Sequence, residues 1–255
     1  MVEPRQLDER FPDWRSVEIF GPPGAGKSFF CREFLRQRPI LATCDDLATR
    51  HFVDLRLGRA SRLAAHLFSQ RVMKNLYKLQ LDRLARRYWN RRDAEVQRYL
   101  AAVERIIRQA RLQRGSEKNV RKSVRYTGLA LALTYESQRQ ILVDEGLIRK
   151  LITLLVQCAA PDGRAELLDS IRACLAAYPW ERNAVLVDAP PSLCIERQLA
   201  RGHVIHRPGK SQPLQQAAAW QVLELCEEAR WKTLRIWNAA DDSAQPPGLP
   251  PKVAA

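Results

Sequence analysis

The chain alternates short apolar runs with longer segments in which apolar residues recur every three or four positions. The short, β-rich runs predict five strands, at 17–20, 40–44, 140–144, 183–188 and 233–238. The helical spacing predicts helices at 27–38, 147–158, 165–177, 192–200 and 213–231, with a Pro-Asp-Gly turn at 161–163. Strands that alternate with helices indicate an α/β fold: a doubly wound, parallel five-stranded sheet between two helical layers.

Residues 47–135 interrupt this alternation. Their pattern is helical throughout, and the segment is too long for a simple crossover between two strands. We therefore expect a large helical insertion, at about 47–135, within a single domain that spans 1–242. The Pro- and Ala-rich residues 243–255 are expected to form a flexible tail.

Composition is that of a soluble globular protein, with 46% apolar and 27% charged residues. No apolar run approaches the roughly 20 residues of a membrane span, and the N-terminus does not resemble a signal peptide. A cytoplasmic location without membrane association is the expectation. The six cysteines lack CxxC spacing, which favours reduced thiols over disulfides or zinc ligands.

The sequence Gly-Pro-Pro-Gly-Ala-Gly-Lys-Ser at 21–28 fits the Walker A pattern G-x-x-x-x-G-K-[ST]. It lies between a predicted strand and a predicted helix. Glycines let backbone N–H groups turn toward a β-phosphate, and the helix N-terminus faces the same anion. Lys27 is expected to span the β- and γ-phosphates, and Ser28 to bind Mg²⁺. The expected nucleotide-binding residues are Gly21, Pro22, Pro23, Gly24, Ala25, Gly26, Lys27, Ser28 and Phe29.

A carboxylate near the metal is the second requirement, and the strand at 140–144 supplies it. This strand ends in Asp144, followed by Glu145. Carboxylates at the carboxyl edge of a parallel sheet face the crevice in which such sheets bind ligands. One of the two is expected to hold Mg²⁺, with Asp144 the assigned metal ligand, and the other to accept a proton from a substrate hydroxyl. Asp144 also suits a helix N-cap.

The C-terminal third resembles thymidylate-kinase-like P-loop kinases. The matching segments are VLVDAPPSLCIERQLARG at 185–202 and the last predicted strand, TLRIWNAADD, and the resemblance covers 17–46, 140–148 and 184–242. It implies the P-loop NTPase fold and transfer of a phosphoryl group from ATP. It also implies a lid whose arginines close on that group. Arg197 and Arg201 match the helix positions, and the Gly- and Pro-flanked loop RGHVIHRPGK at 201–210 adds Arg207. Guanidinium groups suit this role because they bind phosphate oxygens bidentately.

The chain departs from thymidylate kinases where they carry Asp-Arg-Tyr or Asp-Arg-Ser, because it has Asp144, Glu145 and Gly146 there. The missing arginine favours an uncharged hydroxyl acceptor, such as a nucleoside or sugar. Asp45 and Asp46 lie where several small-molecule P-loop kinases contact the acceptor hydroxyl, and they are the expected substrate ligands. A helix cap is an equally good interpretation of these two aspartates.

The net charge of +14 is concentrated in the middle of the chain. Residues 51–125 carry 20 Lys and Arg against 6 Asp and Glu. A solvated helical face, a pocket for an anionic acceptor and a nucleic-acid surface all fit this excess. Five aromatic residues could stack on bases, or pack within the helices: Tyr77, Tyr88, Trp89, Tyr99 and Tyr126.

Together these features predict a kinase dependent on ATP and Mg²⁺ that acts on a small hydroxyl or phosphate acceptor. Lys27, Asp144, Glu145, Arg197, Arg201 and Arg207 are the expected catalytic residues. The alternative is an ATP-binding or ATPase module that acts on nucleic acid or on a protein partner.

Overall fold

The structure is a computed structural model, and it describes residues 9–37, 42–43, 93–109, 140–144, 146–157, 161–202 and 211–238. Strands and helices alternate along most of this chain, as the hydrophobic pattern predicts. The strands are β1 (Ser16–Phe20), β2 (Ala42–Thr43), β3 (Ile141–Asp144), β4 (Asn183–Asp188) and β5 (Lys232–Trp237). The helices are α2 (Lys27–Gln37), α6 (Ala94–Gln109), α8 (Leu147–Gln157), α9 (Pro161–Ala176), α10 (Pro191–Leu199) and α11 (Gln212–Glu228).

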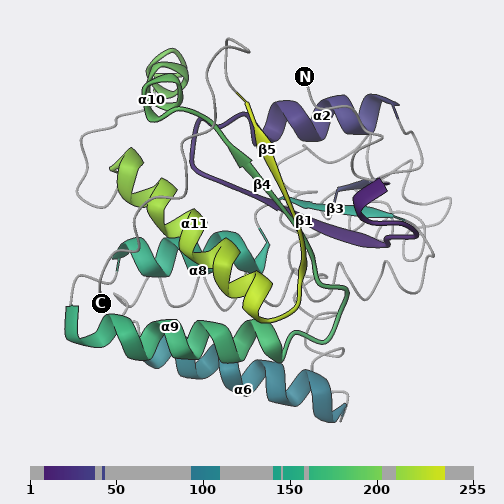
Figure 1. The fold of residues 1–255 in the computed structure, drawn as a ribbon, viewed down its shortest axis with the longest axis vertical. Helices are drawn as coiled ribbons and strands as arrows, with labels where there is room; N and C mark the ends of the chain where they lie inside the picture. Colours follow the sequence, from purple (N-terminus) through teal and green to yellow (C-terminus); the bar gives the residue numbers. More distant parts are fainter. Residues whose placement is uncertain are drawn as a thin grey trace, which may run out of the picture.

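The sheet is parallel at every pairing, so the fold is mixed α/β (Figure 1). Four strands run in the order β3-β1-β4-β5, and the two residues of β2 pair with β3 at the edge. β1 is therefore central, with Ile19 opposite Asp144 on one side and Val185 on the other. The carboxyl ends of β1, β3 and β4 consequently meet at one edge of the sheet.

Apolar side chains cover both faces of the sheet because successive strand residues point to opposite sides. Val17, Ile19 and Val187 pack with Phe34 of α2 on one face. Phe20, Val143 and Leu186 pack on the other face against the helices α8, α9 and α11. Figure 1 shows α2 on one side of the sheet and α8 with α11 on the opposite side.

Helix α6 is the described part of the predicted insertion, and its helical conformation confirms the prediction for 94–109. It packs against α9 and forms an outer layer on the side away from α2 (Figure 1). Tyr99 is 1% exposed and contacts the rings of Tyr178 and Trp180 edge-on, at centroid distances of 5.5 and 5.6 Å. Tyr99 therefore serves the core and is not a base-stacking residue. Tyr77, Tyr88, Trp89 and Tyr126 lie outside the described residues.

The predicted turn at 161–163 is wrong, because α9 begins at Pro161 and includes all three residues. Proline suits the first turn of a helix, where its fixed φ is already helical and its missing N–H would have no intrahelical partner. Among the described residues, no helix is long and apolar enough to span a membrane.

Candidate phosphate-binding site

The segment 21–28 forms a tight loop between the end of β1 and the start of α2. Gly21, Gly24 and Gly26 have φ angles of 146°, 86° and 101°, conformations that other L-residues rarely adopt. A Cβ on Gly21 would overlap the carbonyl oxygen of Val187, so the loop also lies too close to β4 for any side chain there. The glycines of the motif are thus required both by backbone conformation and by packing.

Lys27 is the first residue of α2, and its side chain folds back over the loop. Its Nζ donates to the carbonyl oxygens of Gly21 and Pro22, both at 3.0 Å. The first turn of α2 contains no acidic residue, so no carboxylate of this turn offsets the positive end of the helix dipole. A lysine ammonium and a helix N-terminus at one glycine loop form a site suited to an anion.

Side chains from three later elements support the outer side of the loop. Arg197 of α10 donates to Gly24 O at 3.3 Å, and Gln212 of α11 donates to Pro23 O at 3.0 Å. Gln198 also donates to Pro23 O, at 3.2 Å, and to the Gln212 side chain. Asn238, just after β5, donates to Ala25 O at 2.8 Å. These bonds hold the carbonyl oxygens of three successive loop residues, Pro23, Gly24 and Ala25, in place.

Asp144 lies at the carboxyl end of β3, next to β1, and is half-buried. Its closeness to the loop is evident at Cys31 of α2. The pKa of the Cys31 thiol is raised to about 12, mainly by burial and also by the charge of Asp144, while the charge of Lys27 lowers it. Both charges act on the same thiol, so the predicted metal ligand Asp144 and the loop lysine Lys27 lie in the same region.

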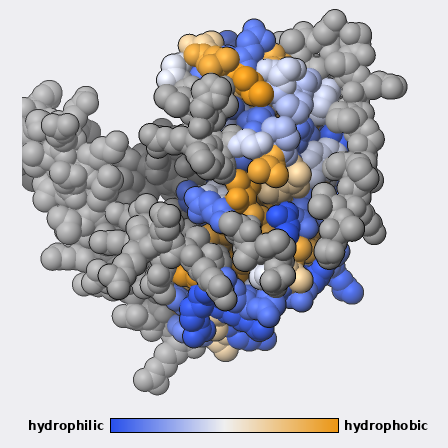
Figure 2. Space-filling model, turned by 90° about the vertical axis from the view of Figure 1, so that its left-hand side faces the viewer, coloured by the Kyte–Doolittle hydropathy of each residue, from blue (hydrophilic) through white to orange (hydrophobic). Residues whose placement is uncertain are grey.

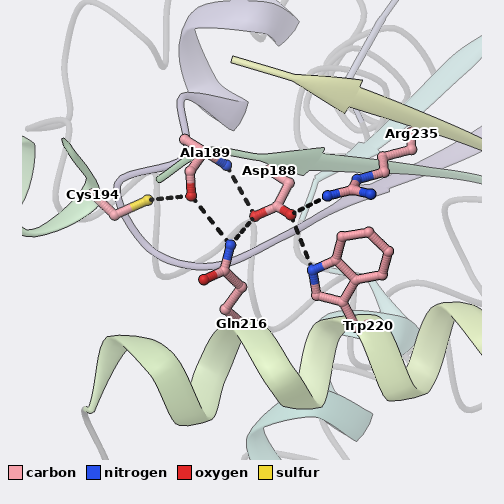
Figure 3. Close-up of polar contacts among 6 residues, drawn as sticks. All are labelled: Asp188, Ala189, Cys194, Gln216, Trp220 and Arg235. Atoms are coloured by element: carbon pink, nitrogen blue, oxygen red, sulfur yellow. Dashed lines mark hydrogen bonds and ion pairs between the residues drawn. The ribbon is translucent and has the colours of Figure 1, made fainter. Parts of the chain in front are cut away.

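Asp188, at the end of β4, is fully buried and receives four donors (Figure 3). Oδ1 accepts from the backbone N–H of Ala189 at 2.9 Å and from Gln216 at 2.8 Å. Oδ2 accepts from the Trp220 indole at 3.0 Å and forms an ion pair with Arg235 at 3.2 Å. The Arg235 guanidinium lies 3.4 Å from the centroid of the Trp220 ring. This cluster fixes the end of β4 against α11 and β5.

The remaining predicted residues are placed in different ways. Ser28 and Phe29 are exposed in the first turn of α2, and Arg201 is exposed just after α10. Arg197 contacts the loop, as described above. Asp45, Asp46, Glu145 and Arg207 lie outside the described residues.

Large apolar side chains are exposed at the ends of the helices near the loop. Phe29 is 48% exposed, Leu199 at the end of α10 is 58% exposed, and Leu214 near the start of α11 is 56% exposed. Figure 2 views the side on which α10 and α11 lie in Figure 1, and hydrophobic residues appear there at the top and in the middle. The surroundings of the loop thus combine cationic and apolar surface.

Sequence reasoning did not identify Gln198, Gln212 or Asn238 as contacts of the loop, nor Glu18 as a buried acid. Amide side chains on helices carry no motif, so only the fold brings them to the loop. Glu18 had a usable signal, because it is the one charged residue in the strand 16–20 and lies between apolar neighbours.

Neither a family model nor a characterised protein sequence matches this chain.

Proposed function

We propose that the protein is a P-loop kinase that transfers the γ-phosphoryl group of ATP, with Mg²⁺, to a small hydroxyl or phosphate acceptor. The observation that carries the proposal is the conformation of residues 21–28. Three glycines with positive φ connect β1 to α2, and Lys27 closes over the loop. We take the strand order β3-β1-β4-β5, with β2 paired at the edge, as that of the P-loop NTPase fold.

The residues present fit Mg-ATP. Lys27 and the N-terminus of α2 would hold the β- and γ-phosphates, since the first turn of α2 has no carboxylate to repel them. Ser28 is exposed there and would bind the metal together with Asp144, from the neighbouring strand. Mg-ATP, when bound, supplies the transferable phosphoryl group and a divalent charge next to it.

Arg197 is the described residue best suited to stabilise charge on the transferring group. It lies on α10 with Nη1 3.3 Å from Gly24 O, so a small movement would bring its guanidinium to a phosphate. Arg201 and Arg207 remain proposed lid residues, and Asp45 and Asp46 proposed acceptor ligands. Glu145 or Asp144 would accept the proton of the acceptor hydroxyl.

The test is mass spectrometry of products after incubation of the protein with Mg-ATP and a mixed acceptor panel. The panel contains nucleosides, nucleoside monophosphates, sugars and short RNA, and Lys27→Ala is the matched variant. We expect one acceptor to gain a phosphoryl group, at a rate that falls by about 100-fold or more in Lys27→Ala.

Two results would contradict the kinase. ADP without any phosphorylated acceptor, formed faster with RNA, would support the ATPase module instead. RNA binding with an affinity that falls steeply as the salt concentration rises would accompany that outcome, because protein contacts with RNA phosphates release counterions. Failure of the protein to bind ATP at all would remove both functions.

A further inference from the structure

Glu18 is a buried acid in the central strand, and the mechanism proposed above does not use it. It is 3% exposed and lies opposite Val143 of β3 and Ala184 of β4. Its neighbours along the strand, Val17 and Ile19, face the α2 side, so Glu18 points to the opposite face, toward α8. An ionisable side chain at such a position is costly unless its oxygens are bonded.

The Glu18 carboxyl reaches the first turn of α8. Oε1 accepts from the backbone N–H of Ile148 at 2.5 Å and from that of Arg149 at 3.4 Å. Ile148 is fully buried, so water cannot satisfy its N–H group. The first turn of a helix has no intrahelical acceptors for its N–H groups, and Glu18 supplies one from another strand.

Gly146 leaves room for this contact. A Cβ at residue 146 would lie 2.6 Å from Cδ and 2.7 Å from Oε1 of Glu18, closer than side-chain atoms approach one another. The space next to Asp144 is therefore fitted to the Glu18 carboxyl. A glycine at 146, where thymidylate kinases carry Tyr or Ser, is consistent with this packing.

A gain in the free energy of folding does not explain the presence of a buried carboxyl group at position 18. Burial raises its pKa to about 8, although the backbone N–H groups of Ile148, Arg149 and Leu147 lower it. Oε2 is buried and has no hydrogen-bond partner among the described residues. An apolar residue in the strand would avoid this cost, so the carboxyl contributes something other than free energy of folding.

We propose that Glu18 is a positioning residue for the metal ligand Asp144, because it fixes the start of α8 relative to β1. The backbone on each side of Asp144 is bonded to β1, the strand that leads into the phosphate loop. On its N-terminal side, β3 pairs with β1, and on its C-terminal side, Glu18 holds the first turn of α8. The inference rests on the proposed function, since it assumes that Asp144 serves a metal bound with a nucleotide.

The test measures how Mg²⁺ strengthens binding of a fluorescent, non-hydrolysable ATP analogue to the full chain. Glu18→Gln keeps an acceptor for the Ile148 N–H, whereas Glu18→Met removes it. Gly146→Ala adds a Cβ 2.6 Å from Cδ of Glu18 and 2.6 Å from Cγ1 of Val143, so the carboxyl and the Val143 side chain must both shift. Leu175→Ala is the control, because Leu175 is fully buried in α9 and its truncation destabilises the core away from the site.

We expect Glu18→Met and Gly146→Ala to raise the Mg²⁺ concentration for half-maximal effect by about tenfold, as loss of a group that orients a metal ligand does. Glu18→Gln should stay within about twofold of the unmodified protein. Nucleotide binding in EDTA should not change in any of these variants, because it depends on the loop and Lys27.

The positioning role would be overturned if Glu18→Met and Gly146→Ala needed the same Mg²⁺ concentration for half-maximal effect as Leu175→Ala. If Glu18→Met does not fold, Gly146→Ala alone decides in the same way. Absence of nucleotide binding by the unmodified protein, with and without Mg²⁺, would instead contradict the proposed function, on which the inference depends.

Discussion

β3 and β4 end in nearly the same four residues, Ile-Leu-Val-Asp at 141–144 and Val-Leu-Val-Asp at 185–188, yet their final aspartates have different surroundings. Both strands pair with β1, one on each side. Asp188 is fully buried and accepts four hydrogen bonds, whereas Asp144 is half-buried near Lys27. The same sequence pattern thus produces a structural carboxylate on one strand and a candidate catalytic one on the other.

The neighbours of each strand account for the difference. α11 crosses β4 and brings the side chains of Gln216 and Trp220 to Asp188, while β5 brings Arg235. Burial lowers the pKa of the Arg235 guanidinium, and Asp188 partly offsets this effect. A carboxylate with two oxygens has little capacity left after four donors. A strand that ends in Asp at a sheet edge therefore indicates a site only when the next elements leave the carboxylate accessible.

The largest effect that would test this comparison is expected from Asp188→Asn. Whichever way the amide turns, its NH₂ group faces two of the four donors that now bond the carboxylate, and the charge that pairs with Arg235 is lost. We expect the free energy of unfolding to fall by about 3 kcal/mol, below the loss for a fully buried pair because Arg235 is partly exposed. Urea denaturation measures it. A variant as stable as the unmodified protein would contradict the structural role of Asp188.

Asp144→Asn is the matched substitution on β3, and its expected effect falls on activity. Loss of the charge that we propose to hold the metal should reduce the proposed phosphoryl transfer by about 100-fold, or roughly 2.7 kcal/mol. The free energy of unfolding should change by less than about 1 kcal/mol, because Asp144 is only half-buried. Rates come from the product assay and stabilities from urea denaturation. Retention of full activity would show that the two aspartates do not differ as we propose.

The strands and the glycine loop at 21–28 could be predicted from the sequence because their signals are local. Apolar runs placed each described strand of four or more residues to within about one residue, and the motif at 21–28 located the loop. The partners of Asp188 could not be predicted, since Trp220 and Arg235 lie 32 and 47 residues away and meet it only in the folded sheet. Glu18 and Ile148 are 130 residues apart. The helical start at Pro161 was missed because Pro-Asp-Gly also favours turns.

Glu18 lies on β1, between the strands that carry the two aspartates, and its titration is expected to appear as a pH dependence of the free energy of unfolding. Its pKa is raised from the ordinary 4.5 to about 8, so the folded protein holds a proton that the unfolded chain releases between these values. The contribution of this proton to the free energy of unfolding is therefore complete below pH 4.5. It is lost as pH rises toward 8, with a slope of at most about 1.4 kcal/mol per pH unit.

Glu18→Gln removes this titration. The charged and titratable groups that interact with Glu18 are Lys150 of α8, Tyr99 of α6 and Cys226 of α11. The free energy of unfolding of the unmodified protein minus that of Glu18→Gln should thus decrease from pH 5 to pH 8 and level off above pH 8. Urea denaturation at a series of pH values measures this difference. A constant difference would mean that Glu18 is ionised in the fold. In that case its Oε2 must have a donor, and Glu18 would resemble Asp188, a carboxylate with its charge compensated, more than the neutral acid proposed here.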